Sequence, residues 1–400
     1  MFDKEKMKDY LENIAIPRAI GTQGNRIAVQ RSQRIFEKVG LKVNLQEFLC
    51  NHFYSIWFLR IFLGSLISLI ILTKYQLSGK NWYFFLAAYS ILFALFIFVQ
   101  NNHDKAIWGK KIRAKNVIAI PNRPENSRSH EMVADNNINI VISAHIDSKS
   151  QTFTQKQRAI WIGIVIVIFS VAIPLSLVFI VITIFREIPL INDVLFWVLI
   201  GDLFLFFLFF LLNQSGNKSP GALDNGTGMV VIFSIAEYIQ RKIDKEPDFG
   251  KNLNFWFCLF NCEEFGQIGT INWIKSKQEI LDPRNTWVFN FDMPGSRRDE
   301  GVTVYKTEGL LKKEICPPCQ DLITKTAQEK NIPLQYTQII VGKTDRIPFA
   351  KKGFRAVDFG SDKAIQWGHS EGDKIKNANF EILEKNCKLL FHIIESLNEG

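Results

Sequence analysis

Six acidic and imidazole side chains stand at or just after the ends of apolar runs, in five short segments of the chain. They are His145, Asp224, Glu263, Glu264, Asp292 and His369, in segments that read VISAHIDSKS, GALDNGTG, FNCEEFGQIGT, VFNFDMPG and IQWGHSEGD. Two imidazoles with a surplus of carboxylates and no cysteine are the ligand chemistry of hydrolytic zinc, whereas structural zinc sites are rich in cysteine. Four of the five segments follow or close a β-type run, so the loops of one sheet can deliver them to one point. The pattern therefore predicts an enzymatic metal site.

The elements that must position these residues alternate between strands and helices. Residues 137–144 form a continuous apolar run, which is typical of a central strand buried on both faces, and the run ends at His145. Helical periodicity covers 25–39, about 228–242 and 380–398, and further strands are predicted at 42–48, 116–120, 254–260, 286–291, 302–306 and 356–359. This alternation predicts an α/β fold with a mixed central sheet flanked by helices.

Four apolar blocks of about twenty residues each interrupt this pattern. They are Tyr54–Thr73, Trp82–Val99, Ile160–Phe185 and Val194–Leu212. That length crosses the hydrocarbon core of a bilayer, while buried helices of soluble proteins are usually shorter and carry a polar stripe. We therefore expect two inserted transmembrane hairpins, at 53–100 and 155–213. Residues 1–52, 101–154 and 214–400 then form one catalytic domain.

The distribution of basic residues predicts the orientation of these spans. The segment 101–158 carries ten Lys and Arg residues, whereas the two hairpin loops carry only Lys74, Lys80 and Arg186. By the positive-inside rule, we expect an integral membrane protein with four spans and its catalytic domain on the cytoplasmic side. The N-terminus also lacks the apolar region of a secretory signal. Basic residues beside the predicted spans, where they would face anionic lipid, account for much of the net charge of +9. We therefore expect lipid and no nucleic acid as a partner.

Six cysteines fit a reducing compartment, and two of them have the spacing of a redox motif. Cys316 and Cys319 flank two prolines, but no thioredoxin-like strand–helix–strand pattern precedes them. We interpret the prolines as the opening of a helix at 320–329, and a redox role as the weaker alternative.

The ordered series H-x-D, G-A-x-D-N, E-E-x-G-x-x-G, N-x-D and a late histidine resembles the zinc exopeptidases of metallopeptidase family 28. That group includes aminopeptidases, glutamate carboxypeptidases and, as a divergent branch, glutaminyl cyclases. The resemblance covers nearly all of the chain outside the apolar blocks. It implies the zinc-exopeptidase fold, two zinc ions per chain and peptide substrates.

The resemblance also implies a role for each residue of the site. His145 and Asp292 would bind one zinc ion, Glu264 and His369 the other, and Asp224 would bridge them. Glu263 would be the general base that takes a proton from a metal-bridging water and passes it to the leaving amine. Asp147 would hydrogen-bond the second ring nitrogen of His145 and fix its tautomer.

One segment departs from the family pattern. Where the family usually shows Ser-Asp-His-x-Pro-Phe, residues 343–349 read KTDRIPF, with Thr344 and Arg346 in place of the Ser and the His. Neither position is a ligand in the pattern, so the departure bears on substrate contacts. We expect Arg346 to pair with Asp345 at the surface, with a substrate carboxylate as the alternative partner. Asp345 and His52 fit no ligand position.

The leading functional hypothesis is a membrane-anchored dizinc exopeptidase that removes N-terminal residues. A single-zinc glutaminyl cyclase is the first alternative, because residues 145–149 echo its HxDSK motif. A receptor or scaffold that has lost catalysis is the second, although all six site positions are intact. Within the membrane, Asp202 is expected to face the other helices. Arg60 either pairs with it or extends toward the interface. Side-chain preference and oligomeric state do not follow from the sequence.

Overall fold

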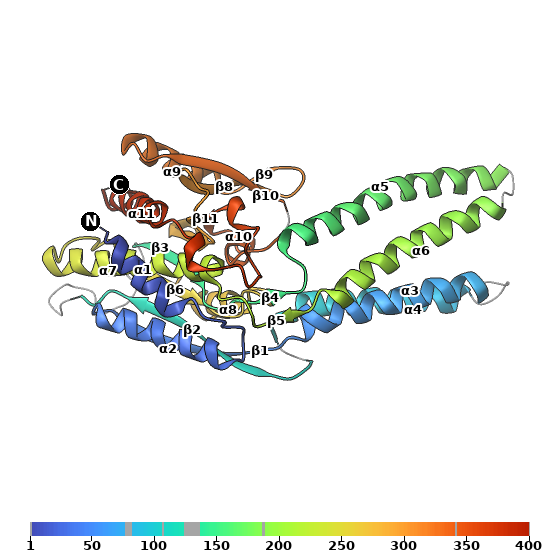
Figure 1. The fold of residues 1–400 in the computed structure, drawn as a ribbon, viewed down its shortest axis with the longest axis horizontal. Helices are drawn as coiled ribbons and strands as arrows, with labels where there is room; N and C mark the ends of the chain where they lie inside the picture. The colour runs from blue at the N-terminus through green and yellow to red at the C-terminus, as the bar shows by residue number, and fades with distance from the viewer. Residues whose placement is uncertain are drawn as a thin grey trace. The chain divides into compact units, whose positions relative to one another are not determined.

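The computed structural model describes residues 2–76, 82–105, 108–123, 137–185, 189–340 and 342–399. The chain divides into two compact units (Figure 1). The first comprises Met1–Cys50, Lys111–Ser150 and Gly216–Gly400, and the second comprises Asn51–Lys110 and Gln151–Ser215. Two of the residues used above to orient the predicted hairpins, Lys80 and Arg186, lie outside the described residues.

A nine-stranded mixed sheet forms the centre of the first unit. Its strands are β1 (Lys42–Cys50), β2 (Ile112–Ile120), β3 (Ile138–His145), β6 (Leu253–Phe260), β7 (Thr286–Asp292), β8 (Val302–Glu308), β9 (Lys313–Glu314), β10 (Leu334–Ile339) and β11 (Arg355–Gly360). The order is β1-β2-β6-β3-β7-β11-β8-β10, with β9 paired to β8. The four central strands β6, β3, β7 and β11 run parallel to one another. Their carboxyl ends therefore lie along one edge of the sheet.

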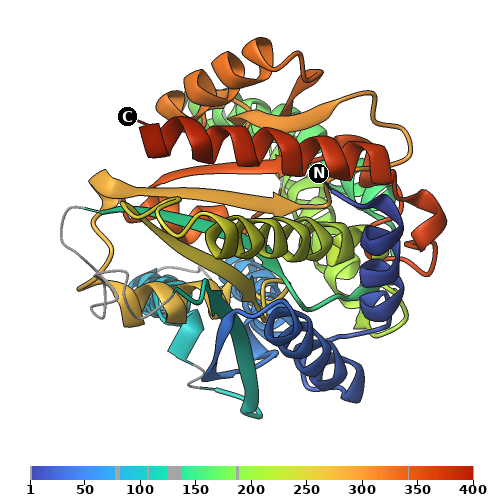
Figure 2. The ribbon, with the colours of Figure 1, turned by 90° about the vertical axis from the view of Figure 1, so that its left-hand side faces the viewer.

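Helices cover both faces of this sheet (Figure 2). The helices are α1 (Lys4–Ile14), α2 (Gln23–Lys38), α7 (Gly228–Lys245), α8 (Ile268–Lys277), α9 (Pro317–Glu329), α10 (Arg346–Lys351) and α11 (Phe380–Glu399). Ile140 and Ile142 of β3 belong to the large core with α1, α2, α7, α9 and α11, while the intervening Val141 packs with α8 and α10. This alternation follows from the two-residue period of a strand. The predicted mixed α/β fold is confirmed.

The strand and helix ends differ by a few residues from the sequence prediction, and the structure contains several elements that were not predicted. The helix predicted at 320–329 begins earlier, at Pro317, directly after Cys316. Cys316 and Cys319 form a disulfide, whereas Cys50, Cys258, Cys262 and Cys387 are free and buried. The elements α8, α10 and β10 were not predicted from the sequence.

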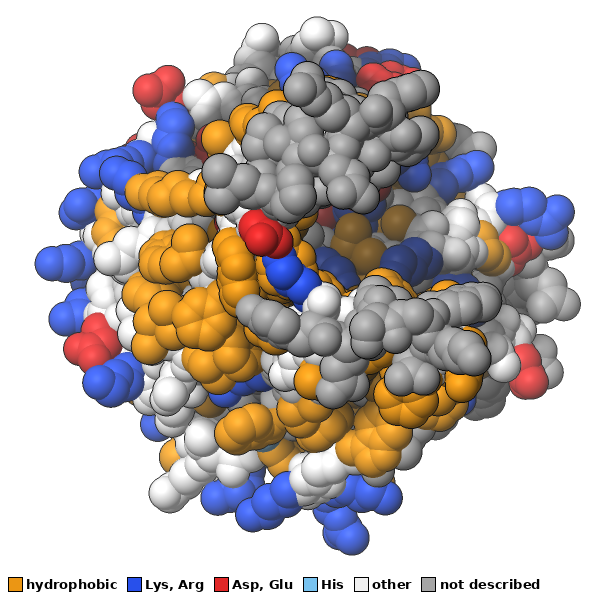
Figure 3. Space-filling model, turned by 90° about the vertical axis from the view of Figure 1, so that its right-hand side faces the viewer, with side chains coloured by type: hydrophobic (Ala, Val, Ile, Leu, Met, Phe, Trp, Pro, Cys, Tyr) orange, Lys and Arg blue, Asp and Glu red, His pale blue; other side chains and the backbone are white. Residues whose placement is uncertain are grey.

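The second unit contains the helices α3 (Leu59–Gln76), α4 (Trp82–Asn101), α5 (Gln155–Phe185) and α6 (Pro189–Leu212), with a helical turn at Phe53–Phe58 before α3. Large apolar side chains are exposed along these helices, including Phe84, Ile91 and Val167. Figure 3 faces the ends of these helices and shows hydrophobic side chains gathered over this face. Within the described residues, one helix, Tyr83–Asn101, is long and apolar enough to cross a membrane, with a mean hydropathy of 2.1. The described residues thus offer one candidate span, and the four-span topology remains a prediction.

Arg60 and Asp202, which were considered as a pair, have separate surroundings. The Arg60 Nε donates to the backbone oxygen of Phe210 at 2.8 Å, and its guanidinium lies over the ring of Trp57. Asp202 is buried, and its carboxylate has no hydrogen-bond partner within the described residues. The pairing hypothesis is therefore wrong for this conformation, because a backbone carbonyl takes the Arg60 donor.

Each stretch that forms the second unit leaves and returns at neighbouring residues. In the β1–β2 pair, Cys50 lies opposite Ile112. The short strands β4 (Ser150–Gln151) and β5 (Ser215–Gly216) pair with each other, and just inside them the Thr152 amide donates to the oxygen of Gln214 at 3.1 Å. Both stretches therefore begin and end at a strand pairing.

Candidate metal centre

The six chemically distinctive residues of the sequence occupy the carboxyl end of the parallel strands and the loop before α7. His145 is the last residue of β3 and Asp292 the last residue of β7. Glu263 and Glu264 follow β6, His369 follows β11, and Asp224 lies in the turn Ala222–Thr227. Five loops that are distant in sequence thus meet at one edge of the sheet, which is where ligands bind in such folds.

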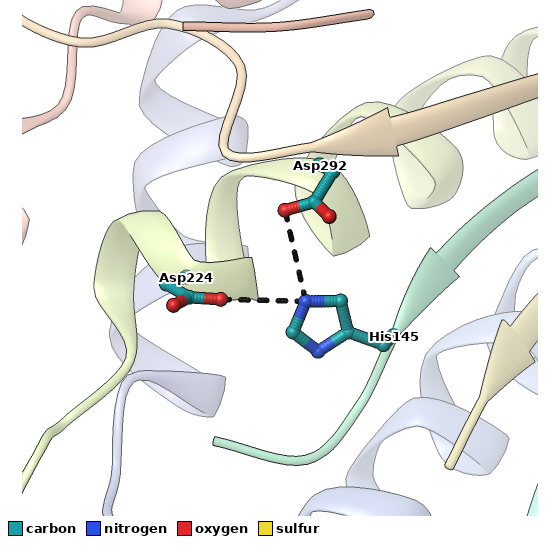
Figure 4. Close-up of side chains that lie close together, drawn as sticks. All are labelled: His145, Asp224 and Asp292. Carbon is teal, nitrogen blue, oxygen red and sulfur yellow. Dashed lines mark ion pairs between the residues drawn. The ribbon is translucent and has the colours of Figure 1, made fainter. Parts of the chain in front are cut away.

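The first cluster joins His145, Asp224 and Asp292 (Figure 4). The Nε2 atom of His145 lies 3.3 Å from Oδ1 of Asp224 and 3.8 Å from Oδ1 of Asp292. All three side chains are largely shielded from solvent. The ring nitrogen and both carboxylates point toward one another, so their donor atoms converge on one small volume.

The second cluster uses the other oxygen of Asp224. The Nε2 atom of His369 lies 3.1 Å from Oδ2 of Asp224 and 3.0 Å from Oε1 of Glu264. In each cluster the ligand atoms lie within 4.8 Å of one another. Two ligand atoms at about 2.0–2.1 Å from one tetrahedral zinc ion stand roughly 3.3 Å apart. The distances and the mixed N/O donors of both clusters therefore fit metal binding, with Asp224 shared between them.

Glu263 belongs to neither cluster, although it precedes a member of the second. It is buried, and its Oε1 accepts a hydrogen bond of 2.9 Å from Nε2 of Gln267. Burial raises the pKa of Glu263 well above its ordinary value, and the negative charge of Glu264 adds to that effect. A carboxylate held in this way can accept a proton more readily than an exposed one.

Lys149 binds the carboxylate oxygen of Glu264 that does not contact His369. Its Nζ lies 2.6 Å from Oε2 of Glu264 and also donates to the backbone oxygen of that residue at 3.1 Å. Burial alone would raise the pKa of Glu264, but the charges of His369 and Lys149 hold it at about 2. With Oε2 engaged by Lys149, Glu264 directs Oε1 toward the second cluster.

The predicted contact of Asp147 differs from the one observed. The Nδ1 atom of His145 lies 2.9 Å from the backbone oxygen of Asp147, while the carboxylate is 3.9 Å away. The carboxylate instead accepts the backbone N–H groups of Glu263 at 3.1 Å and Glu264 at 3.2 Å. The peptide group is thus the histidine's partner, because the side chain turns toward the loop after β6. Asp147 fixes two segments of the site at once.

Arg18 and Asp373 are functional candidates that sequence reasoning missed. The buried guanidinium of Arg18 donates to backbone oxygens of three segments that meet behind the site: Ile14, Ile16, Ile146, Pro220 and Gly221. Asp373 accepts the N–H groups of Leu223 at 2.6 Å and Asp224 at 3.1 Å. Burial and the charge of Asp224 raise the pKa of Asp373 to about 7. In the segment GHSEGD, Asp373 follows His369 by four residues, and this closeness in sequence to a ligand candidate is the signal that could have identified it.

Gly221 is required where Arg18 meets this turn. Its φ of +63° lies in the left-handed region, and an added Cβ would come within 2.7 Å of the Arg18 Nη1 atom. A larger residue would therefore strain the backbone and displace the arginine.

Arg346 is neither at the surface nor paired with Asp345, so that prediction is wrong. It is buried, its Nε donates to Oδ2 of Asp358 at 2.8 Å, and its Nη2 contacts Glu308. Asp358 also accepts from Asn290 at 2.8 Å and from Thr344 at 2.9 Å. The α10 helix turns the arginine inward onto the sheet, where the carboxylate of Asp358 would otherwise be buried without a cation.

Ser143 extends this network to the central strand, because its Oγ donates to Oδ1 of Asn290 at 2.8 Å. Ser143 and Asn290 lie two residues before His145 and Asp292 on the same strands. With a period of two, each polar residue shares a sheet face with its ligand candidate. The network therefore lies directly beneath the first cluster, on the face covered by α8 and α10. Asp345, in the turn before α10, accepts a hydrogen bond from Thr270.

Comparison with known proteins relates the chain to peptidases. The profile of Peptidase family M28 matches residues 210–394, just under half of the chain. Aminopeptidase YwaD of Bacillus subtilis (strain 168) is 25% identical over 174 residues, which cover 42% of this chain and 35% of that protein. The Arabidopsis thaliana protein named Probable glutamate carboxypeptidase LAMP1 is 27% identical over 147 residues, which cover 35% of this chain and 19% of that protein. The chain thus spans about a third or less of each relative. These matches support a peptidase role.

Solved structures share the fold across the whole chain. An aminopeptidase from Aneurinibacillus sp. strain AM-1 superimposes with a TM-score of 0.56 at 15% identity, covering 99% of this chain and 94% of that one. A zinc aminopeptidase from Bacillus subtilis gives 0.54 at 13% identity, covering 99% and 95%. Glutaminyl cyclase from Porphyromonas gingivalis gives 0.54 at 14%, covering 99% and 98%. Peptidases and a cyclase score alike, so the fold alone does not distinguish these activities.

Proposed function

We propose that the chain is a membrane-anchored dizinc exopeptidase of family M28, and specifically an aminopeptidase that hydrolyses N-terminal peptide bonds. The observation that carries the proposal is the position of Asp224, which offers one carboxylate oxygen to each of two histidine-containing clusters. One ion would be held by His145, Asp224 and Asp292, and the other by Asp224, Glu264 and His369. A shared carboxylate between two complete ligand sets is typical of two-metal hydrolytic sites.

The chemistry follows from the residues around these clusters. When bound, two zinc ions polarise a scissile carbonyl and lower the pKa of an attacking water. Glu263 takes a proton from the attacking water and transfers it to the leaving amine, and Gln267 holds its carboxylate in place. Asp147 acts as a positioning residue, since it binds the backbone of the loop that carries Glu263.

Replacing Glu263 with glutamine tests the role of the base. The amide keeps the size of the side chain but cannot accept the proton, so we expect the turnover number to fall by about 10²–10⁴-fold or more. Zinc content, measured by elemental analysis of the purified chain, should stay at two ions. Loss of zinc together with preserved turnover per bound metal would show that Glu263 is a ligand.

Replacing Asp224 with alanine tests the shared ligand. Both clusters lose a donor in this variant, so we expect loss of zinc as well as loss of aminoacyl-anilide hydrolysis. Two ions that stay tightly bound in this variant would exclude Asp224 as the bridge. An Asp244→Ala variant, on the far part of α7, is the matched control and should keep both zinc and activity.

A single-zinc glutaminyl cyclase is the second candidate, because that structural neighbour scores as well as the peptidases and Lys149 completes an HxDSK sequence. The two candidates differ in zinc stoichiometry and in product. A peptide that begins with glutamine would lose ammonia without cleavage in a cyclase, whereas a peptidase would release free glutamine. Mass spectrometry of one such peptide separates the two outcomes.

Membrane anchoring is part of the proposal, with the hairpins at 53–100 and 155–213 and the catalytic domain formed by 1–52, 101–154 and 214–400. The exposed apolar side chains of α3 to α6 support it, because such surfaces are unfavourable in water. We place the catalytic domain on the cytoplasmic side, with peptides as substrates and lipid as the surrounding partner. Fractionation after alkaline carbonate extraction tests the anchor, since an integral protein stays in the pellet.

A further inference from the structure

Two adjacent arginines lie against one tryptophan ring in the first unit. The guanidinium carbon of Arg297 is 5.0 Å from the centre of the Trp367 ring, and that of Arg298 is 5.4 Å from it. Both arginines are exposed, and the ring is half-buried. Stacking on an aromatic face orients a guanidinium and leaves its N–H donors available to another group.

The ring borders the candidate metal centre. Trp367 packs against the cluster formed by Leu223, Met293 and Ala364. Leu223 directly precedes Asp224, Met293 directly follows Asp292, and Trp367 lies two residues before His369. The tryptophan therefore packs on a cluster that contains the neighbours of two ligand candidates, and it is close in sequence to a third. From these contacts we infer that the two arginines over this ring lie at the rim of the candidate site.

The loop that carries the arginines is held in a defined conformation. The backbone N–H of Arg297 donates to the oxygen of Asn377 at 2.7 Å, and the N–H of Ser296 donates to Oδ2 of Asp299 at 2.8 Å. The other oxygen of Asp299 accepts from Ser361 at 2.7 Å. Asp299 is thus occupied by its own loop and by the segment after β11. Within the described part of the chain, neither guanidinium forms an ion pair with a carboxylate.

We propose that Arg297, Arg298 and Trp367 form a carboxylate-recognition site, so that the preferred substrates are peptides with a carboxylate close to the scissile bond. The inference rests on the proposed peptidase function and adds its substrate class. Two guanidinium groups present a planar array of donors that matches a carboxylate, and such charge-assisted hydrogen bonds are stronger than neutral ones. The carboxylate can belong to an acidic side chain or to the C-terminus of a short peptide.

Three pairs of peptides distinguish these sources, each pair differing in one charge. Leu-Glu-Gly-amide and Leu-Gln-Gly-amide test the second side chain, Glu-Leu-Gly-amide and Gln-Leu-Gly-amide test the first, and Leu-Gly-Gly with its amide tests the terminal carboxylate. Dissociation constants are measured by calorimetry on the full-length, zinc-loaded Glu263→Gln variant in detergent. Rate constants are measured on the active chain. We expect at least one charged member to bind about tenfold more tightly than its neutral partner, with the difference expressed in KM.

The double variant Arg297→Gln, Arg298→Gln should abolish that preference, and Arg297→Lys, Arg298→Lys should restore part of it, because it keeps the charge. Arg284→Gln is the control, since this exposed arginine pairs with Asp282 away from the rim. The inference is overturned if every pair binds within twofold, or if the double glutamine variant keeps the preference. Failure of the active chain to cleave any peptide would refute the peptidase function. The calorimetric binding measurements on the Glu263→Gln variant would still test the carboxylate-recognition site.

Discussion

Replacing Arg346 with methionine would leave the buried carboxylate of Asp358 without its cationic partner. The side chains of Arg346 and Asp358 are 3% and 0% exposed, and they are joined at 2.8 Å. Removing one member of a buried ion pair costs about 3–5 kcal/mol, because the other charge stays buried. Asp358 keeps its hydrogen bonds from Asn290 and Thr344, so we expect a loss near the lower end, about 3 kcal/mol.

The assay follows unfolding through the buried cysteines. Cys50, Cys258, Cys262 and Cys387 are free, buried and located in the first unit. Labelling by a maleimide during a thermal ramp therefore reports the opening of that unit in the detergent-solubilised chain. For a unit of this size, each kcal/mol shifts the midpoint by about 2–4 °C, so we expect Arg346→Met to lower it by roughly 6 °C or more. Arg284→Met, at an exposed pair, is the control and should shift it little.

A double-mutant cycle then tests the physical reason. If the cost arises from the unpaired charge, adding Asp358→Asn to Arg346→Met should recover part of the loss, because the amide is neutral and keeps an acceptor for Asn290. The double variant should be less destabilised than the sum of the two single variants by at least about 1 kcal/mol. Additive losses would refute the charge argument and assign the effect of Arg346 to its packing alone.

Three further predictions concern the site and the membrane. Replacing Asp373 with alanine should weaken zinc binding by about 10–100-fold, because this carboxylate anchors the Asp224 backbone; unchanged affinity in chelator competition would contradict that role. Removing zinc from the wild-type chain should lower the thermal midpoint, because ligands that bind only the folded state stabilise it; an unchanged midpoint would mean that the folded chain does not bind zinc tightly. A cysteine at Ser78, in a predicted outer loop beyond the described residues, should react with an impermeant maleimide on intact cells, while one at Ser276 on α8 should not. The reverse pattern would place the catalytic domain outside.

Much of the site was predictable because its residues end strands. A run such as 137–144 marks a central strand by composition alone, and parallel central strands bring their last residues to one edge. His145 and Asp292 could therefore be selected from position and residue type. Asp224 was distinguished by its glycine-framed turn, and the structure now brings it within 3.3 Å of His145 and 3.1 Å of His369.

The surroundings of the site could not be predicted in the same way. Arg346 looked like a surface residue because its segment is polar, but its direction depends on how α10 packs on the sheet. The choice between the carboxylate and the carbonyl of Asp147 depends on backbone angles that a sequence motif does not encode. Arg18 lies in a segment without regular period, and its five carbonyl partners come from segments up to about 200 positions away.

The paired ends of the two stretches that form the second unit have a consequence for how the chain can be shortened. Cys50 faces Ile112, and Thr152 bonds to Gln214, so each stretch occupies the place of a turn between two adjacent strands. A turn of two to five residues can join such strands, and surface turns tolerate long insertions at a small entropic cost. Each stretch can therefore be exchanged for a short turn without moving the strands that it joins. A short Asn-Gly turn in each place is a direct route to the first unit as a separate chain.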